Sequence, residues 1–155
     1  MSSSKINYIA VFVAALAVFV AGFLWYSPIL FGNLWLKAHG YTPEQLETMR
    51  AFAGRAYTVS FACYLVMGTV LTLLIAKTGA TTAVTGLKLG ALTWLGFAAT
   101  IGLTANMFSS QPFSLYLIDA GYQLVYLMVM GAILGGWRKK AVEVPSTKTV
   151  PVGAA

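Results

Sequence analysis

Charged residues are scarce in this chain of 155 residues: Asp, Glu, Lys and Arg together make up 9% of it, whereas hydrophobic residues make up 59%. Soluble domains carry roughly 25% charged residues, which cover the surface that faces water. So few charges cannot cover a globule of this size, and the mean hydropathy is +0.78. The composition therefore excludes an ordinary soluble domain and predicts a protein that is surrounded by lipid.

Cysteine and histidine are nearly absent as well, with Cys63 and His39 as the single copies. One cysteine excludes an intramolecular disulfide and a CxxC motif, and this pair cannot supply the usual ligands of a zinc or haem site. The net charge of +6 could suggest nucleic acid, but the basic residues do not form the stripe that such a partner requires. We therefore expect no cofactor, no metal and no nucleic-acid partner.

What the chain has instead is long uncharged runs, at residues 6–36, 56–76, 89–118 and 120–137. A helix needs about 20 apolar residues to cross the ~30 Å hydrocarbon layer. The last run is long enough only if Asp119 lies inside the membrane. We predict an all-α, polytopic membrane protein with four transmembrane helices, at roughly 6–27, 56–76, 85–108 and 113–136.

These helices form one predicted domain, residues 1–140. The tail, 141–155, has two prolines and little bulk, and we expect it to be disordered. The apolar start of the chain could be a signal peptide, but it is longer than the ~7–15 apolar residues of such peptides. We interpret it as an uncleaved first helix.

The basic residues also predict the orientation. With four spans, seven basic residues share the side of both termini and only three lie on the other side: Lys37, Arg50 and Arg55. Because positively charged loops stay in the cytoplasm, both termini are predicted to be cytoplasmic, in the cell membrane (plasma or inner membrane). The longest loop, 31–55, is then external.

Part of that external loop has the signature of a helix start. Thr42 is a suitable N-cap, Pro43 fits the first helical position and Glu44 places an acid in the first turn. Apolar residues then recur at helical spacing up to Ala53. We predict a short external amphipathic helix here, between the first and second transmembrane helices, which lies at the outer interface and leads into the second.

The first transmembrane helix ends in Trp25-Tyr26-Ser27-Pro28. An aromatic pair suits the headgroup region of a membrane, and a proline disfavours helix at the residue before it. The motif is thus explained as an interfacial belt with a helix stop. It could also line or roof a pocket, because the sequence after the proline stays apolar and keeps the chain at the membrane boundary.

This motif also carries a family resemblance. The WYSP string followed by Phe31-Gly32 and Trp35, the Trp94-x-Gly96-Phe97 segment, and "LYLIDAGYQLVYLMVMGAILGGW" resemble a domain-of-unknown-function family of small four-helix integral membrane proteins. The resemblance covers roughly residues 6–137. It implies an integral membrane fold and no established activity, substrate or cofactor.

Asp119 is the one ionisable residue predicted to lie well inside a span. Such residues are costly in lipid and usually face protein or water. Polar and aromatic residues of all four helices should reach its depth, and these form the candidate pocket or polar network: Trp25, Tyr26, Ser27, Arg55, Tyr57, Asn106, Tyr116, Asp119 and Gln123. Either they form a small-ligand or ion site that opens outward, or Asp119 bonds to Asn106 or Arg55 and fixes the register of the helices.

Small residues predict where helices pack closely. Gly86-x-x-x-Gly90 and Gly131-x-x-x-Gly135 should lie at matching depth in the antiparallel third and fourth spans. Glycine lets two helix backbones approach each other in a membrane. We therefore predict tight packing of these two helices at that point.

No catalytic set of cooperating groups is visible, so we expect a protein that is not an enzyme. The first hypothesis for function is an uncharacterised membrane bundle that associates with copies of itself or with a membrane partner and contributes an outward-facing polar pocket. The alternative is a small transporter or channel subunit for an ion or small solute, with Asp119 on the pathway. The sequence does not identify a ligand.

Overall fold

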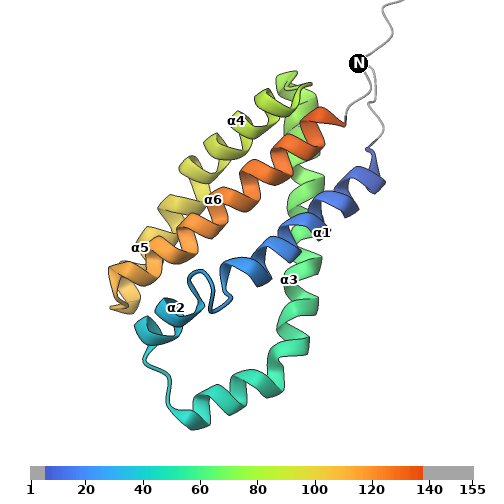
Figure 1. Cartoon of the computed structure of the whole chain (residues 1–155). Coiled ribbons are helices and arrows are strands. Elements are labelled where there is room, and N and C mark those ends of the chain that lie inside the picture. Colours follow the sequence, from blue (N-terminus) through green and yellow to red (C-terminus); the bar gives the residue numbers. More distant parts are fainter. Residues whose placement is uncertain (1–5, 138–155) are drawn as a thin grey trace, which may run out of the picture.

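The computed structural model describes residues 6–137, and the regular elements of this part of the chain are all helices (Figure 1). Its elements are α1 (Tyr8–Trp25), α2 (Gly32–His39), α3 (Pro43–Thr78), α4 (Ala83–Thr93), the π-helical turn η1 (Trp94–Ala98), α5 (Ala99–Ser109) and α6 (Phe113–Gly136). The predicted tail, residues 141–155, lies outside the described residues.

Four of these segments are long and apolar enough to cross a membrane: α1, α3, the continuous run Ala83–Ser109, and α6. They coincide with the four predicted spans, so the all-α class and the four-helix architecture are confirmed. The chain is a multi-pass membrane protein. Many large apolar side chains on the outside of these helices are exposed, among them Ile9, Val66 and Ile101, and lipid is the solvent that such a surface fits.

The second span differs from the prediction. The Thr42 N-cap is confirmed, since its hydroxyl accepts from the Gln45 N–H while the Gln45 side chain accepts from the Thr42 N–H. The helix is 36 residues long, so segment 43–53 leads into the second span as predicted, but it does so without a break and forms the beginning of α3. No proline follows Pro43 within α3, and Gly54 is tolerated, so nothing breaks the hydrogen-bond ladder.

A short helix does lie between the first two spans, but it is α2, which directly follows the WYSP segment. Gly40 ends α2 in the left-handed conformation, with φ +64°. Glycine reaches this conformation without the steric penalty of a side chain. The chain can therefore reverse within a few residues and begin α3.

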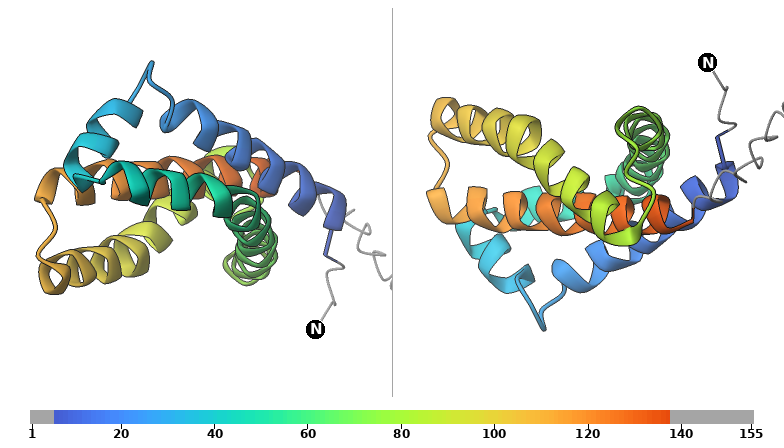
Figure 2. Two further views of the ribbon diagram at one scale, coloured as in Figure 1. Left: turned by 90° about the horizontal axis from the view of Figure 1, so that it is seen from below. Right: turned by 90° about the horizontal axis from the view of Figure 1, so that it is seen from above.

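Helix α6 lies between two groups of helices (Figure 2): α1 and α2 pack on one side of it, and α4 with α5 packs on the other. The closest approach is between α4 and α6. A Cβ added at Gly86 would collide with the Gly131 carbonyl, and one added at Gly90 would collide with the Leu127 carbonyl. These small residues thus lie in backbone-to-backbone contact, and Gly135 packs against Gly86 in the same way.

The two ends of the bundle are built differently. Where α1 begins and where α3 and α6 end, the interior is packed with apolar side chains, including Val11, Ile75 and Leu134. Toward the other end α1 and α3 diverge, and α2 lies across that end of the bundle (Figure 1). The packed end fixes how the helices sit, and the open end carries the aromatic and polar residues.

Candidate functional site

The WYSP segment forms a compact turn that redirects the chain from α1 into α2. The N–H groups of Leu30 and Gly32 both donate to the Ser27 carbonyl, at 3.1 and 2.9 Å, and the Phe31 N–H donates to the Trp25 carbonyl at 3.0 Å. A Cβ at Gly32 would collide with the backbone of Tyr26 and Ser27. Only glycine therefore fits where α2 folds back against the end of α1.

This turn brings two aromatic donors to one carboxylate. The Tyr26 hydroxyl donates to Asp119 Oδ1 at 2.8 Å, and the Trp35 indole N–H donates to the same oxygen at 3.0 Å. Burial and the neighbouring carboxylate raise the pKa of the Tyr26 phenol, which lies just beyond the end of α1. Tyr26 stays protonated at neutral pH, and it links the turn to the first third of α6, as Trp35 links α2 to the same part of that helix.

Two further indoles donate to α6 at the residues on either side of Asp119. Trp25 donates to the Ile118 carbonyl at 3.1 Å, and Trp94, in the π-helical turn, donates to the Ala120 carbonyl at 2.8 Å. Gly121 makes room for the Trp25 ring, which an added Cβ would approach to 3.2 Å. Aromatic side chains from both sides of α6 thus converge on three consecutive residues of that helix.

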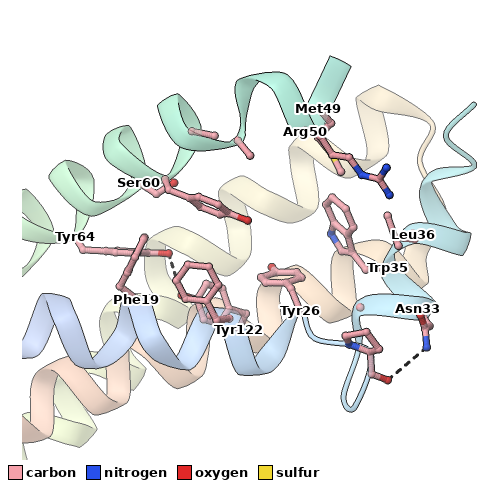
Figure 3. A pocket seen from close by; sticks show the side chains of 17 residues that line it. Phe19, Tyr26, Asn33, Trp35, Leu36, Met49, Arg50, Ser60, Tyr64 and Tyr122 are labelled. Atoms are coloured by element: carbon pink, nitrogen blue, oxygen red, sulfur yellow. Dashed lines mark hydrogen bonds between the residues drawn. The ribbon is translucent and has the colours of Figure 1, made fainter. Parts of the chain in front are cut away.

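A cavity of about 510 Å³ opens between α1, α2 and α3 (Figure 3). We call it the aromatic cavity because rings form much of its wall: Phe19, Phe23, Tyr26, Trp35, Tyr57, Tyr64 and Tyr122. Arg50 is the one charged residue among those that line it. In Figure 3 the Arg50 side chain extends from α3 toward the side of the cavity where Trp35 and Leu36 lie.

The inner wall of the aromatic cavity is held by hydrogen bonds of Tyr122. Its hydroxyl donates to the Val18 carbonyl at 2.9 Å and lies 3.0 Å from the hydroxyl of Tyr64. Gly22 leaves the space that the Tyr122 hydroxyl occupies, because a Cβ there would collide with it. This contact joins α1, α3 and α6 behind the cavity, so the wall is rigid where the helices begin to diverge.

A second cavity, of about 280 Å³, lies on the opposite side of Asp119, between α5 and α6. We call it the polar cavity, and its lining includes Asn106, Ser109, Gln111, Tyr116, Asp119 and Gln123. Asn106 is only 8% exposed. Its Oδ1 and the Oε1 of Gln123 are buried without a hydrogen-bond partner in the described residues.

The structure divides the predicted pocket residues between these two cavities. Tyr26 and Tyr57 line the aromatic cavity. Asn106, Tyr116 and Gln123 line the polar one, as does Asp119 itself, which bonds to two residues of the aromatic wall.

The remaining predicted residues line neither of the two cavities. Trp25 bonds to the α6 backbone, and the Ser27 hydroxyl, just beyond α1, donates to the Leu24 carbonyl of that helix at 2.7 Å. Arg55 is exposed, and within residues 6–137 it forms no ion pair with Asp119. The partners of that carboxylate are Tyr26 and Trp35 rather than Asn106 or Arg55.

Sequence reasoning missed Arg50 and five of the rings that line the aromatic cavity: Phe19, Phe23, Trp35, Tyr64 and Tyr122. Spacing held a signal for some of them. Tyr57 and Tyr64 are seven residues apart, as are Phe19 and Tyr26, so each pair lies on one face of its helix. Aromatic residues that recur every second turn on two neighbouring helices indicate a shared aromatic surface.

A comparison with known families identifies the family of this chain. The family described as "Protein of unknown function (DUF1761)" matches residues 9–135. The chain belongs to this family. The match extends over both cavities and nearly all of the four spans, and it assigns no activity. No curated protein and no solved structure matches the chain.

Proposed function

We propose that this membrane protein is non-enzymatic and binds a small amphipathic molecule in the aromatic cavity. The observation that carries the proposal is the cavity itself: about 510 Å³ of space, walled by rings and lined by a single charged residue, Arg50. Ligand sites of this kind combine a mostly apolar wall with a few polar groups that fix orientation. An anionic group on the ligand would pair with the Arg50 guanidinium.

The position of the cavity along α3 supports an amphipathic ligand. Charged residues of α3 occur at Glu44, Glu47, Arg50 and Arg55, and the next charge is Lys77. The hydrocarbon layer therefore begins near residue 56. The lining residues of α3 run from Met49 to Tyr64 and so extend across this boundary. A ligand would place its polar end at the headgroup level and its apolar body among the rings.

In this function Asp119 has a structural role, because it holds two residues of the cavity wall in place. Its Oδ1 already accepts from Tyr26 and Trp35, the two aromatic residues that connect the WYSP turn and α2 to α6. A carboxylate engaged in this way is a poor general base, because its oxygen is committed to two donors. This engagement supports a binding role over a catalytic one.

One observation favours the alternative of a transporter or channel subunit: Asp119 also borders the polar cavity on the other side of α6. A pathway would have to continue through the packed end of the bundle. The core cluster there consists of hydrophobic residues such as Val11, Leu71 and Leu134. We therefore favour the binding function over the transporter or channel alternative.

Three further expectations belong to the proposal. The protein is expected in the cell membrane with both termini in the cytoplasm, which makes the α2 end external. Association with a second copy or a membrane partner is also expected. The exposed apolar sides of α1 and α3 offer a surface for it.

Titration with laurate, a small amphipathic anion, tests the proposal. Native mass spectrometry of the detergent-solubilised protein would count the bound laurate. We expect binding to weaken about tenfold in Arg50→Gln, since a lost charged hydrogen bond costs roughly 1.5–3 kcal/mol.

Arg55→Gln is the matched control, because Arg55 lies on the same helix and outside the cavity lining. Equal laurate binding by the wild type and both variants would refute the proposed site.

A further inference from the structure

We propose that the polar cavity between α5 and α6 is a binding site for a small monovalent cation, with Na⁺ as the first candidate. The inference does not rest on what occupies the aromatic cavity. It rests on the side chains that line the polar cavity, which include two amides whose buried oxygens have no donor in the described residues and one carboxylate.

The orientation of the Asn106 amide is fixed by its neighbour. Its Nδ2 lies 3.4 Å from the Pro112 carbonyl and donates to it. Because a carbonyl can only accept, the amide cannot be turned around without placing two oxygens against each other. Oδ1 must therefore point away from Pro112, and it is buried there without a donor, in a residue that is 8% exposed.

Two other oxygen-bearing groups line the same space. Gln123 Oε1 is buried and has no partner within the described part of the chain. Asp119 contributes a carboxylate whose hydrogen bonds from Tyr26 and Trp35 both go to Oδ1. The cavity thus combines one negative charge with two neutral acceptors, and no residue of its lining carries a positive charge.

The hydroxyl groups of the cavity do not supply the missing donors. The Ser109 hydroxyl donates to the Asn106 carbonyl at 3.1 Å, and the Tyr116 hydroxyl donates to the Ala99 carbonyl at 3.1 Å. Leaving a buried acceptor unpaired costs about 1–3 kcal/mol. A bound cation interacts only with acceptors. It would remove this cost at both amide oxygens and would also neutralise the charge of Asp119.

A monovalent ion fits this donor set better than a divalent one. Carboxylate, amide and carbonyl oxygens are ligands for hard cations, whereas protein sites for Ca²⁺ typically combine several carboxylates. In the described residues no group of three or more His, Cys, Asp or Glu side chains could hold a metal ion. The volume of about 280 Å³ leaves space for water in the coordination shell.

Thermal unfolding in two salts tests the proposal. The protein, purified in detergent, would be heated in NaCl and in N-methyl-D-glucamine chloride at equal ionic strength. An ion that binds only the folded state raises the melting temperature with its concentration. We expect a saturable rise in Na⁺, and saturable binding of radioactive ²²Na⁺ by the same preparation.

Two variants remove the site without removing the fold. Gln123→Met keeps the side-chain length and deletes an acceptor that has no protein partner. Asp119→Asn keeps an oxygen for Tyr26 and Trp35 while it removes the charge. We expect each to weaken ²²Na⁺ binding at least about tenfold and to abolish the Na⁺-dependent rise in melting temperature.

Asn33→Ala is the control, because this exposed amide lines the aromatic cavity instead. It should keep ²²Na⁺ binding. Absence of ²²Na⁺ binding by the wild type would show that the cavity holds water only. Unchanged binding by Gln123→Met would show that the ion binds elsewhere, and either result would overturn the proposal. Laurate binding should persist in Gln123→Met, which separates this test from that of the proposed function.

Discussion

At the scale of single residues, Asp119 decides how the open end of the molecule is arranged. A carboxylate within a membrane helix is costly unless protein or water surrounds it. Here two ring donors share its Oδ1, and they come from the WYSP turn and from α2. A short segment that would otherwise lie free at the membrane surface is thereby attached to α6.

Asp119→Leu should therefore destabilise the protein. The variant leaves the Tyr26 hydroxyl and the Trp35 indole without their acceptor, and two such losses should lower the free energy of unfolding by about 1–3 kcal/mol. Asp119→Asn retains an acceptor and should lose less. The measurement is the melting temperature in detergent without Na⁺. Equal stability of wild type, Asn and Leu variants would show that these bonds contribute nothing.

The sequence predicted part of this arrangement. It placed Asp119 and Tyr26 in one group, because a lone buried carboxylate needs partners near its own depth. It left Trp35 out of that group, since nothing in the pattern of residues 32–39 shows that the backbone folds back over α6. It included Arg55 because of its depth alone. The second span is apolar on every side, so depth does not show which face of that helix points inward.

At the scale of helices, the α4–α6 contact is the tightest in the structure. It joins backbones directly, because Gly86 and Gly90 face the carbonyls of Gly131 and Leu127. In lipid no hydrophobic effect drives helices together, so close packing of this kind has to replace it. The contact also fixes the position of α5 against α6, between which the polar cavity lies.

A pair of glycine-to-alanine variants tests this contact. Gly90→Ala should lower the free energy of unfolding by about 1–3 kcal/mol, because its methyl group collides with a carbonyl that cannot move independently of α6. Gly54→Ala makes the same change in α3, where no atom lies within 4 Å of the added Cβ. Alanine is the better helix former by up to about 1 kcal/mol, so this control should be neutral or stabilising. Destabilisation of both variants to the same extent would contradict the packing argument.

The positions of the helices were largely predictable from the sequence, whereas the connections and irregularities between them were not. Uncharged length located the first, third and fourth spans within a few residues, and the Thr42 cap located the beginning of α3. The π-helical turn at Trp94 accompanies a contact with another helix, the bond from Trp94 to Ala120. Such contacts are absent from a periodicity argument.

At the scale of the whole molecule, the two ends differ in kind. One end is packed by apolar side chains, and the other holds both cavities, the buried carboxylate and the short helix α2. A protein with this asymmetry presents its binding groups to one side of the membrane only. The direction in which it is inserted therefore decides which compartment supplies the ligand.

Cysteine labelling in whole cells tests that direction. Cys63 is exposed and would first be replaced by alanine. Ser110 lies in the turn between α5 and α6, at the end that carries the cavities. If positively charged loops remain in the cytoplasm, Ser110→Cys should react with a membrane-impermeant maleimide added outside. Thr81→Cys, in the exposed turn between α3 and α4 at the other end, should react only after the membrane is opened. The reverse pattern would place both cavities on the cytoplasmic side, and the ligand and the cation would then have to come from inside the cell.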